Sequence, residues 1–293
     1  MESNSIITNS VYEGVNRKKP IRRVKPLKCY NKGQPLPKVE PTVAPVINTS
    51  EVVKSSITLL KGDCLEVMKG LPDKSVDLIV CDLPYGCLTN QSGESKGFYR
   101  ESHKGTSLIK KLANQSGSGC SWDIKLNLEV FWAEVKRIRR DEHTPTVHFC
   151  NTKFGYDLIK SNEKEFRTEL IWNKERGVSF LSANKSPMRS HEMIYIFSKL
   201  GANYNRIDVE GKCPLSVINF KNTSKGNHPT EKPIDLYKWL IERYSNAGDV
   251  VLDPTAGSFN SGFASKELKR NYIGIEKDNA FFYKAMSRLL KLK

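Results

Sequence analysis

Short apolar runs alternate with amphipathic segments from Ile57 to the end of the chain, and few folds accommodate this alternation. Strands are predicted at 57–62, 76–82, 144–150, 168–174, 192–199, 250–253 and 272–276, and helices at 63–68, 126–139, 154–164, 233–246, 259–269 and in the basic segment after 276. Runs as apolar as VDLIVCD are typical of parallel strands that are buried on both faces. We therefore predict an α/β fold with a doubly wound, mostly parallel sheet that helices cover on both faces.

Three segments lack this alternation. Residues 1–56 contain six of the fourteen prolines, and ten Lys or Arg against four Glu. We expect them to form a disordered basic tail that binds nucleic acid, directs localisation or serves only as a linker. The segments 88–121 and 200–226 are polar or irregular and too long for ordinary connections. The folded part is thus predicted to comprise 57–293 with two long loops.

The whole chain has a formal charge of +15, from 47 Lys and Arg against 32 Asp and Glu. This charge implies a polyanionic partner, with nucleic acid as the first candidate and an anionic membrane as the second. No run reaches the roughly 18 apolar residues of a membrane span, and the polar start is unlike a secretory signal. We expect a cytoplasmic protein, or a nuclear or viral one if the host is eukaryotic. Seven scattered cysteines without a CxxC pair predict neither disulfides nor a metal site.

The residues at the ends of the predicted strands are the candidates for chemistry, because open α/β sheets bind ligands outside the carboxyl ends of their strands. One strand ends in VVLDPTAGSFNSG, which passes from Asp253 through Gly257 into a helix, and Glu276 closes the next strand nineteen residues after Gly257. Small residues let a backbone approach a ligand, and a carboxylate at that place can accept hydrogen bonds from two ribose hydroxyls. The segment indicates either a nucleotide site or only a tight strand–helix connection.

A second strand ends in IVCDLPYG, where Asp82, Leu83, Pro84 and Tyr85 follow a buried run. This segment resembles the catalytic D-P-P-Y signature of amino-methyltransferases. Other segments that carry the resemblance are ITLLKGDC, CSWD, LIWNK, SPMRSHEMIYIF, NHPTEKP, LDPTAGSFNSG and RNYIGIEKD. Over 57–290 the chain is similar to the beta group of DNA methyltransferases, in which the catalytic motif precedes the cofactor motif. The resemblance implies a Rossmann-like methyltransferase domain at 57–293 that acts on double-stranded DNA.

The resemblance also implies roles for the residues of IVCDLPYG. The exocyclic amine of adenine is a poor nucleophile, because its lone pair is delocalised into the ring. The Asp82 carboxylate and the main-chain carbonyl of Leu83 would accept its two N–H bonds and direct the lone pair at the methyl group. Leu83 replaces a common Pro, which leaves that carbonyl in place, and Tyr85 would stack on the flipped base. Asp rather than Ser at position 82 favours adenine N6, and the alternative is an Asp-Pro turn with a core tyrosine.

The cofactor that the resemblance implies is S-adenosylmethionine. Its contacts would come from Asp63, His228, Thr230, Lys232, Asp253, Pro254, Gly257 and Glu276. Glu276 would hold the ribose and Asp63 the adenine amine, whereas the segment of Lys232 would fold over the cofactor carboxylate near a helix N-terminus. The alternatives are that Asp63 is only an N-cap and Lys232 only a solvated charge. Phe259 departs from the family's G-x-G, and it either packs against the cofactor or narrows its pocket.

Two further groups of residues lie at strand ends. The pair His191 and Glu192 is interpreted as structural or substrate-positioning, because amine methylation needs no strong base. Trp172, Asn173 and Lys174 are expected to face the DNA or the flipped base, and a buried core tryptophan is an equal alternative.

Recognition of the DNA sequence is expected from the loops 88–121 and 200–226, and the basic side chains of the first loop would bind phosphates. Members of the family are often homodimers. Three other functions stay open at this point: methylation of cytosine N4, methylation of RNA, and nucleic-acid binding without catalysis.

Overall fold

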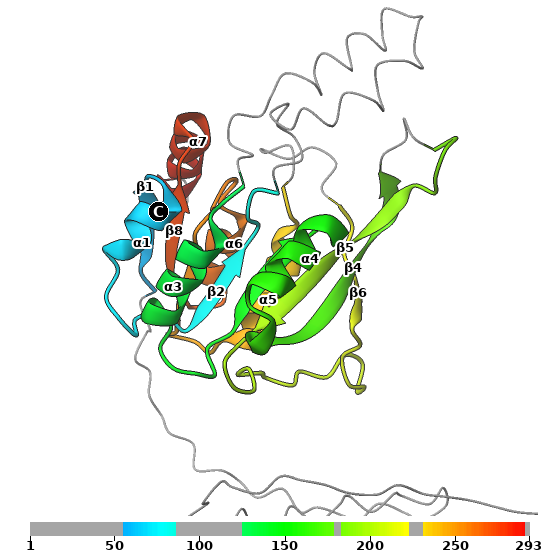
Figure 1. The fold of residues 1–293 in the computed structure, drawn as a ribbon, viewed down its shortest axis with the longest axis horizontal. Coiled ribbons are helices and arrows are strands. Elements are labelled where there is room, and N and C mark those ends of the chain that lie inside the picture. Colours follow the sequence, from blue (N-terminus) through cyan, green and yellow to red (C-terminus); the bar gives the residue numbers. More distant parts are fainter. Residues whose placement is uncertain (1–54, 86–124, 179–182, 223–230, 291–293) are drawn as a thin grey trace, which may run out of the picture. The chain divides into compact units, whose positions relative to one another are not determined.

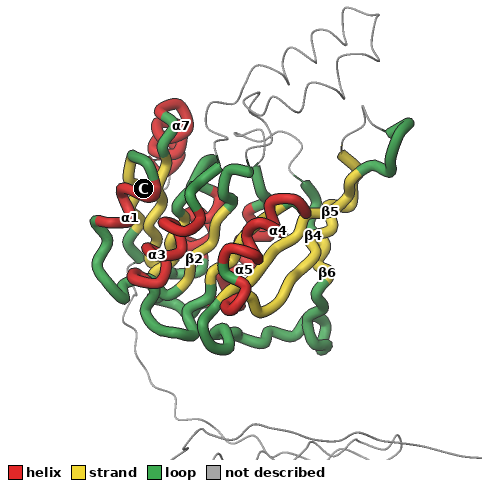
Figure 2. The backbone as a smooth tube through the Cα atoms, in the orientation of Figure 1, coloured by secondary structure: helices red, strands yellow, loops and turns green. Residues whose placement is uncertain are grey.

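The computed structural model describes residues 55–85, 125–178, 183–222 and 231–290, which form one eight-stranded sheet with helices on both sides (Figures 1 and 2). The strands are β1 (Ile57–Lys61), β2 (Leu78–Cys81), β3 (Thr146–Cys150), β4 (Phe166–Val178), β5 (Arg189–Phe197), β6 (Val217–Asn219), β7 (Val250–Asp253) and β8 (Asn271–Glu276). The helices are α1 (Cys64–Lys69), α3 (Leu128–Ile138), α4 (Thr152–Ser161), α5 (Ile234–Tyr244), α6 (Asn260–Glu267), α7 (Asn279–Leu290) and the short 3-10 helix η1 (Glu163–Glu165). None of the helices in these ranges is long and apolar enough to span a membrane.

The strands follow the order β1-β8-β7-β2-β3-β5-β4-β6. All paired strands are parallel except β5, which is antiparallel to both β3 and β4. This arrangement confirms the predicted doubly wound, mostly parallel sheet. Between β7 and β2 the direction of winding reverses, since β2 leads through α3 to β3 on one side and β7 leads through α6 to β8 on the other. Ligands of open α/β sheets bind at such a reversal.

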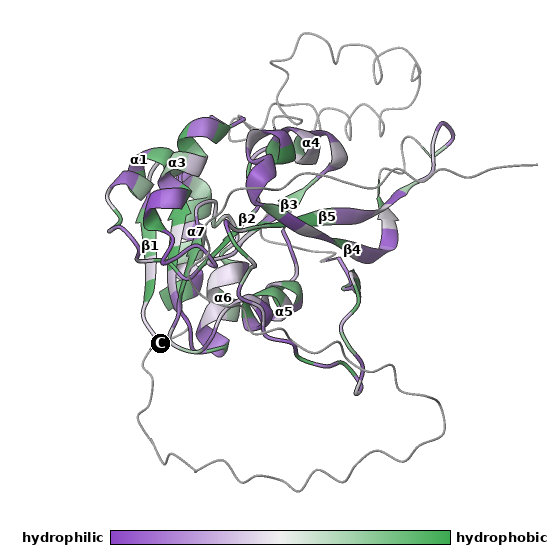
Figure 3. Ribbon diagram, turned by 60° about the horizontal axis from the view of Figure 1, so that its bottom comes forward, coloured by the Kyte–Doolittle hydropathy of each residue, from purple (hydrophilic) through white to green (hydrophobic). Residues whose placement is uncertain are grey.

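Each face of the sheet has its own hydrophobic core (Figure 3). Successive side chains of a strand point to opposite faces, so β2 contributes Leu78 and Val80 to one core and Ile79 and Cys81 to the other. The first core includes residues of α5, α6 and α7, and the second includes residues of α1, α3 and α4. All four residues of β2 are buried, which explains why its sequence is an uninterrupted apolar run.

Local hydrogen bonds explain several differences between the predicted and observed boundaries. Helix α4 begins two residues before the predicted start at 154, because the Asn151 side chain accepts a hydrogen bond from Phe154 N at 2.8 Å and caps the helix. Strand β4 continues four residues past the predicted end at 174, through a shift of register at Glu175, where φ is 56°. Strand β6 was not predicted, because of its three residues only Ile218 is buried and no alternation marks it.

Two predictions on whole segments fall largely outside the described residues. The basic tail at 1–56 is described only for its last two residues, and the loop at 88–121 is not described at all. Residues 200–222 of the second candidate loop are described. Their first part follows the edge of the sheet at which β3 and β7 begin, where Leu200 N donates to Glu142 O at 2.8 Å and Asn205 N donates to Arg243 O at 2.7 Å.

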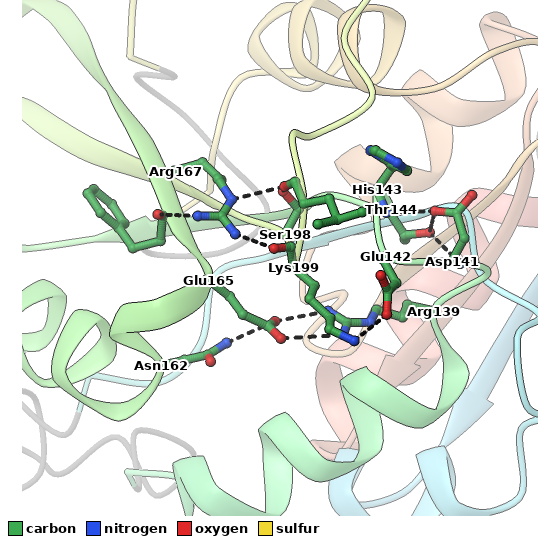
Figure 4. A network of polar contacts seen from close by, with 12 residues as sticks. Arg139, Asp141, Glu142, His143, Thr144, Asn162, Glu165, Arg167, Ser198 and Lys199 are labelled. Carbon is green, nitrogen blue, oxygen red and sulfur yellow. Dashed lines mark hydrogen bonds and ion pairs between the residues drawn. The ribbon is translucent and has the colours of Figure 1, made fainter. Parts of the chain in front are cut away.

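We call this edge, where the parallel strands begin, the amino edge, and the opposite one the carboxyl edge. Figure 4 shows the polar network at the amino edge. Arg139, just after α3, donates to both oxygens of the buried Glu165 at 2.9 and 3.3 Å, and Asn162 donates to the same carboxylate at 3.3 Å. The guanidinium of Arg167 donates to the carbonyls of Lys199 and Leu200. The network therefore connects α3, η1, β4 and the end of β5.

Candidate active site

The two sequence motifs with candidate chemistry meet at the carboxyl edge. Strands β2 and β7 are adjacent and parallel, and Ile79 pairs with Leu252. Asp82 follows β2 and Asp253 ends β7, so this register brings both to the same place. There Thr255 Oγ1 donates a hydrogen bond to the main-chain oxygen of Asp82 at 3.2 Å. The segments IVCDLPYG and VVLDPTAGSFNSG, far apart in the sequence, thus form one surface.

The carboxylate of Asp82 is partly buried, and both of its oxygens accept hydrogen bonds. The hydroxyl of Tyr85 donates to Oδ1 at 2.7 Å, and the ammonium of Lys232 donates to Oδ2 at 2.5 Å. The side chain of Leu83 belongs to the hydrophobic core, so only its main chain can contribute to a polar site. Pro84 restricts the backbone between these residues. The turn therefore presents a carboxylate that is flanked by a phenol and an ammonium.

Tyr85 holds its position through its ring as well as its hydroxyl. The ring stacks on Phe154 of α4, with centroids 5.1 Å apart and an angle of 27° between the planes. Burial raises the pKa of Tyr85 well above its ordinary value, and the carboxylates of Asp82 and Glu192 act in the same direction. The phenol therefore stays protonated and remains a hydrogen-bond donor to Asp82.

Lys232, just before α5, lies between two carboxylates. Only 5% of its side chain is exposed, and Nζ is 2.5 Å from Asp82 Oδ2 and 3.5 Å from Glu192 Oε2. Burial acts to lower the pKa of Lys232, but the charges of Asp82 and Glu192 outweigh it and raise the pKa above its ordinary value. On the other side, Lys174 of β4 donates to Oε1 of Glu192. Lys232 is therefore not a solvated surface charge, and the alternative that treated it so is wrong.

Asp253 is the most deeply buried carboxylate at the carboxyl edge, with 1% of its surface exposed. Its oxygens accept hydrogen bonds from Ser261 Oγ at 2.5 Å and Thr255 N at 3.0 Å. Burial raises the pKa of Asp253 to about 7 although these hydrogen bonds oppose the shift. Pro254, the next residue, is buried. A cation or further donor at this edge would therefore stabilise the ionised form of Asp253.

Glu276 ends β8 next to the turn that follows β7. Its Oε2 accepts a hydrogen bond from Gly257 N at 2.8 Å, and its Oε1 accepts one from Asp278 N at 2.7 Å. Gly257 has φ of 48°, a conformation that glycine adopts without strain. Burial raises the pKa of Glu276, although the backbone hydrogen bonds oppose it. The glycine turn and this carboxylate are therefore in direct contact, and the role of both in binding a nucleotide stays a prediction.

Asp63 lies beside Glu276, because β1 and β8 are parallel and Gly62 N donates to Glu276 O at 3.1 Å. The Asp63 carboxylate caps α1 by accepting a hydrogen bond from Leu65 N at 3.0 Å, and it pairs with Lys277 Nζ at 3.0 Å. Burial acts to raise the pKa of Asp63, but Lys277 and the backbone donors outweigh it and lower the pKa. The N-cap interpretation of Asp63 is correct, and its contact with the cofactor stays a prediction.

Phe259, which replaces the second glycine of the family motif, belongs to the core. Its side chain is 0% exposed, and its ring makes edge contacts with Phe263 at 5.5 Å and Tyr272 at 5.3 Å between centroids. Its φ of 69° lies in the left-handed region, which favours glycine. The substitution therefore costs backbone strain and fills the core, but it leaves no exposed ring surface at the carboxyl edge.

The remaining predicted residues have different outcomes. Trp172 is 1% exposed and its Nε1 donates to Phe220 O at 2.7 Å, so the core interpretation of this tryptophan is correct. Asn173 donates to Asn219 Oδ1 at 2.8 Å across β4 and β6. His228 and Thr230 lie outside the described residues.

Two contacts around Lys232 were not predicted from the sequence. Its ion pair with Glu192 was missed, and so was the hydrogen bond from Asn260 Nδ2 to the Lys232 main-chain oxygen at 2.8 Å. The ion pair depends on the position of Glu192 in β5, which follows from the antiparallel pairing of β5 with β4. No pattern in the sequence of either strand indicates that direction.

Residues 76–287 match the model of the N6/N4 DNA methylase family. The matched range includes the Asp82 turn, Lys232, the Asp253 turn and Glu276. The chain belongs to this family. As a DNA methylase it uses S-adenosylmethionine as methyl donor, in agreement with the predicted cofactor.

Relatives of this methylase include type II methyltransferases. The type II methyltransferase M.HindIII of Haemophilus influenzae is 40% identical over 293 residues, which cover 79% of this chain and 94% of that protein. The type II methyltransferase M.HinfI of the same species is 29% identical over 264 residues, which cover 80% of this chain and 69% of the relative.

Solved structures share the fold. The complex of M1.HpyAVI with S-adenosylmethionine superposes with a TM-score of 0.56 at 22% identity and covers 79% of this chain and 99% of the other. The PvuII DNA methyltransferase, which is cytosine-N4-specific, gives a TM-score of 0.60 at 15% identity over 80% of this chain and 86% of the other. At such identities the likeness concerns the architecture alone.

Proposed function

We propose that this methylase transfers a methyl group from S-adenosylmethionine to N6 of adenine in double-stranded DNA, and that Asp82 holds the target amine. The observation that supports the proposal is the partly buried Asp82 carboxylate on the same edge as Asp253 and Glu276. A carboxylate can accept the two-donor amine of adenine, whereas a serine hydroxyl also donates. In the same direction, the DNA adenine methyltransferase YhdJ of Escherichia coli is 27% identical over 269 residues.

The residues of the Asp82 turn would activate the amine by holding it. Asp82 Oδ2 and the main-chain oxygen of Leu83 accept one N–H bond each, which leaves the nitrogen lone pair to point at the methyl carbon. The nitrogen gains a methyl group and loses one proton, for which the Asp82 carboxylate is the acceptor at hand. The hydroxyl of Tyr85 donates a hydrogen bond to the other carboxylate oxygen, Oδ1, and so fixes its position. The ring of Tyr85 would stack on the flipped base.

The other carboxylates fit a cationic, hydroxyl-rich methyl donor. S-adenosylmethionine supplies an electrophilic methyl group on a sulfonium, whose electron pair is restored when the methyl leaves. Asp253 and Glu276 have pKa values raised by burial, so positive charge and hydroxyl donors in this place would stabilise their ionised forms. Glu276 would accept from the ribose, Gly257 and Pro254 would line the methionine side, and Asp63 would accept from the adenine amine.

The DNA is proposed to approach the carboxyl edge. The hairpin of β4 and β5 extends beyond this edge (Figure 1), and it carries the exposed residues Arg176 and Arg189. Arginines in this place would bind phosphates. Of the two loops predicted to contact DNA, the second begins with residues 200–205, which follow the amino edge. A contact of this loop with the target base would have to come from residues nearer to β6.

If genomic DNA is the substrate, the reaction takes place where that DNA lies, which in a bacterial cell is the cytoplasm. A homodimer stays a prediction.

Identification of the modified nucleoside tests the proposal. Purified protein is incubated with S-adenosylmethionine and unmethylated duplex DNA, the DNA is digested, and the nucleosides are separated by mass. The expected product is N6-methyl-2′-deoxyadenosine. The variant Asp82→Ala is the control that detects methylation by a contaminating methylase. N4-methylcytosine would refute adenine as the target, methylation of RNA alone would refute DNA as substrate, and binding without any methylation would refute catalysis.

A further inference from the structure

The hydrogen bonds of Asp82 in the unbound protein conflict with the task of holding an amine. Oδ1 accepts from Tyr85 at 2.7 Å, and Oδ2 accepts from Lys232 at 2.5 Å. An ammonium at this distance withdraws charge from the oxygen that the target amine needs and fills space next to it. The amine would therefore compete with Lys232 for Oδ2, and its binding is favoured when Lys232 moves, at least in part, away from Asp82.

A buried ammonium cannot leave one carboxylate without reaching another, because an uncompensated buried charge is strongly destabilising. The side chain of Lys232 is 5% exposed, and its second neighbouring carboxylate is Glu192, with Oε2 at 3.5 Å. Shortening this distance by roughly 0.7 Å would give an ordinary charge-assisted hydrogen bond. The movement between the two carboxylates is thus small.

Glu192 is prepared to receive this ammonium. Its Oε1 accepts a hydrogen bond from Lys174, which fixes the carboxylate from the far side. Its Oε2 is buried and has no hydrogen-bond partner among the described residues, although it faces Lys232. Burial acts to raise the pKa of Glu192, but Lys232 and Lys174 outweigh it and lower the pKa, so the carboxylate stays charged.

The backbone around Lys232 restricts the movement to the side chain. Asn260 Nδ2 donates to the main-chain oxygen of Lys232 at 2.8 Å, and Arg288 donates to Asn260 Oδ1 at 2.9 Å. The ring of Phe149 lies below the ammonium, with its centroid 5.3 Å from Nζ. An aromatic face stabilises a cation in more than one lateral position. The Phe149 ring can therefore stabilise the ammonium of Lys232 as it moves from Asp82 to Glu192.

We propose that Glu192 is a positioning residue that provides a second binding position for the Lys232 ammonium, which moves from Asp82 to Glu192 Oε2 when the target amine binds Asp82. This inference rests on the proposed function of Asp82. The two carboxylates and two lysines of the cluster have no net charge before or after the movement. Glu192 thus sets how readily Asp82 becomes an acceptor, without touching the base.

The variant Glu192→Gln tests this role, because it keeps the shape and removes the charge. Without the second charged position at Glu192, Lys232 stays bound to Asp82, and kcat is expected to fall about tenfold to a hundredfold. The affinity for S-adenosylmethionine should stay within about twofold, since the partners of Glu192 among the described residues are Lys174 and Lys232 and not Asp253 or Glu276. Glu192→Asp keeps the charge and is expected to restore part of kcat. Glu169→Gln, an exposed carboxylate on β4, is the matched control and should retain wild-type kcat.

A reporter of base binding separates positioning from a loss of folding. Duplex DNA with 2-aminopurine next to the target adenine should fluoresce more strongly with wild-type protein, because extrusion of the adenine unstacks its neighbour. The increase should be smaller with Glu192→Gln at saturating protein, because the extruded adenine is held less well. Wild-type kcat in Glu192→Gln would overturn the proposal. So would equal losses in Glu192→Gln and Glu192→Asp in folded protein, since the charge would then be irrelevant.

A complex of the wild-type protein with DNA and a non-reactive analogue of S-adenosylmethionine gives a second test that needs no variant. The expected structure has Lys232 Nζ in hydrogen-bonding distance of Glu192 Oε2 and the target amine on Asp82. Lys232 still bound to Asp82 beside a bound amine refutes the movement but leaves the proposed function intact. A target base that does not contact Asp82 refutes the proposed function itself.

Discussion

The two edges of the sheet both bury ion pairs, but the pairs are built differently. At the amino edge, one carboxylate, Glu165, accepts hydrogen bonds from Arg139 and Asn162 on both of its oxygens (Figure 4). At the carboxyl edge, the ammonium of Lys232 is shared between two carboxylates, those of Asp82 and Glu192. One oxygen of this group, Glu192 Oε2, lacks a hydrogen bond among the described residues.

The difference indicates a separation of roles within one sheet: the amino edge stabilises the fold, and the carboxyl edge provides the candidate site. A buried ion pair is tolerated only when additional hydrogen bonds satisfy its polar atoms, and the amino edge meets that condition. At the carboxyl edge Glu192 Oε2 has no hydrogen bond among the described residues, and burial raises the pKa of Asp253 to about 7. Positive charge from a ligand would stabilise the ionised form of Asp253. Four predictions test this separation.

Removal of the Asp82 carboxylate should have the largest effect of the four changes, and this effect should be mainly on activity. In Asp82→Ala we expect kcat to fall by about a thousandfold, because the amine loses its charged acceptor. The free energy of unfolding should change much less, since Lys232 keeps Glu192 as a neighbour. Steady-state methylation of duplex DNA and urea unfolding measure the two quantities. Near-normal kcat in this variant is incompatible with the assigned role.

Breaking the amino edge should have the opposite outcome. Arg139→Met leaves the Glu165 carboxylate buried without its cation, and we expect the free energy of unfolding to decrease by about 3 kcal/mol. Activity per folded molecule should stay within about twofold of wild type, because effects of distant sites are nearly independent. A large loss of kcat in fully folded Arg139→Met would show that the edges are coupled.

The pH dependence of stability should reveal Asp253. Its pKa is about 7 in the folded protein and 3.8 in an exposed carboxyl, so between these values the folded protein holds a proton that the unfolded chain has released. The free energy of unfolding should therefore fall as pH rises from about 4 to 7, by at most about 1.4 kcal/mol per pH unit from this group. Asp253→Asn should remove that part of the slope in urea unfolding. Parallel curves for both proteins would contradict the raised pKa.

The smallest effect should come from Asp63→Ser, which separates capping from cofactor binding. Serine caps helices about as well as aspartate, so stability should stay within about 0.5 kcal/mol of wild type. Its side chain is too short to reach a ligand beyond the helix, and the affinity for S-adenosylmethionine should fall about tenfold in calorimetric titration. Asp73→Ser, a largely exposed aspartate, is the control and should bind normally. Equal affinity in both variants would reduce Asp63 to an N-cap.

The sequence predicted those parts of the fold that depend on burial. VDLIVCD and VVLD are uninterrupted apolar runs because β2 and β7 lie in the middle of the sheet with helices on both faces. Strand direction is not encoded in such runs, so nothing in EMIYIFSK indicated that β5 is antiparallel. The three-residue β6 was too short for any pattern.

The candidate site was predictable to the extent that strand ends define it. Asp82, Asp253 and Glu276 were found because carboxylates follow three buried strands, and the parallel register places them at one edge. The pairing of Lys232 with Asp82 and Glu192 was not predictable, because it joins three separate segments and depends on the direction of β5. The catalytic and cofactor-binding roles of these residues remain predictions for experiment.

The sheet order also affects how the protein folds during synthesis. Strand β1 pairs with β8 and one side of β2 pairs with β7, so these sides of the N-terminal strands have their partners near the other end of the chain. At about 5–20 residues per second, a ribosome needs many seconds to supply them. A nascent polypeptide therefore exposes an unpaired β1, and a product terminated before β7 lacks both the Asp253 turn and Glu276, the residues proposed to bind the methyl donor.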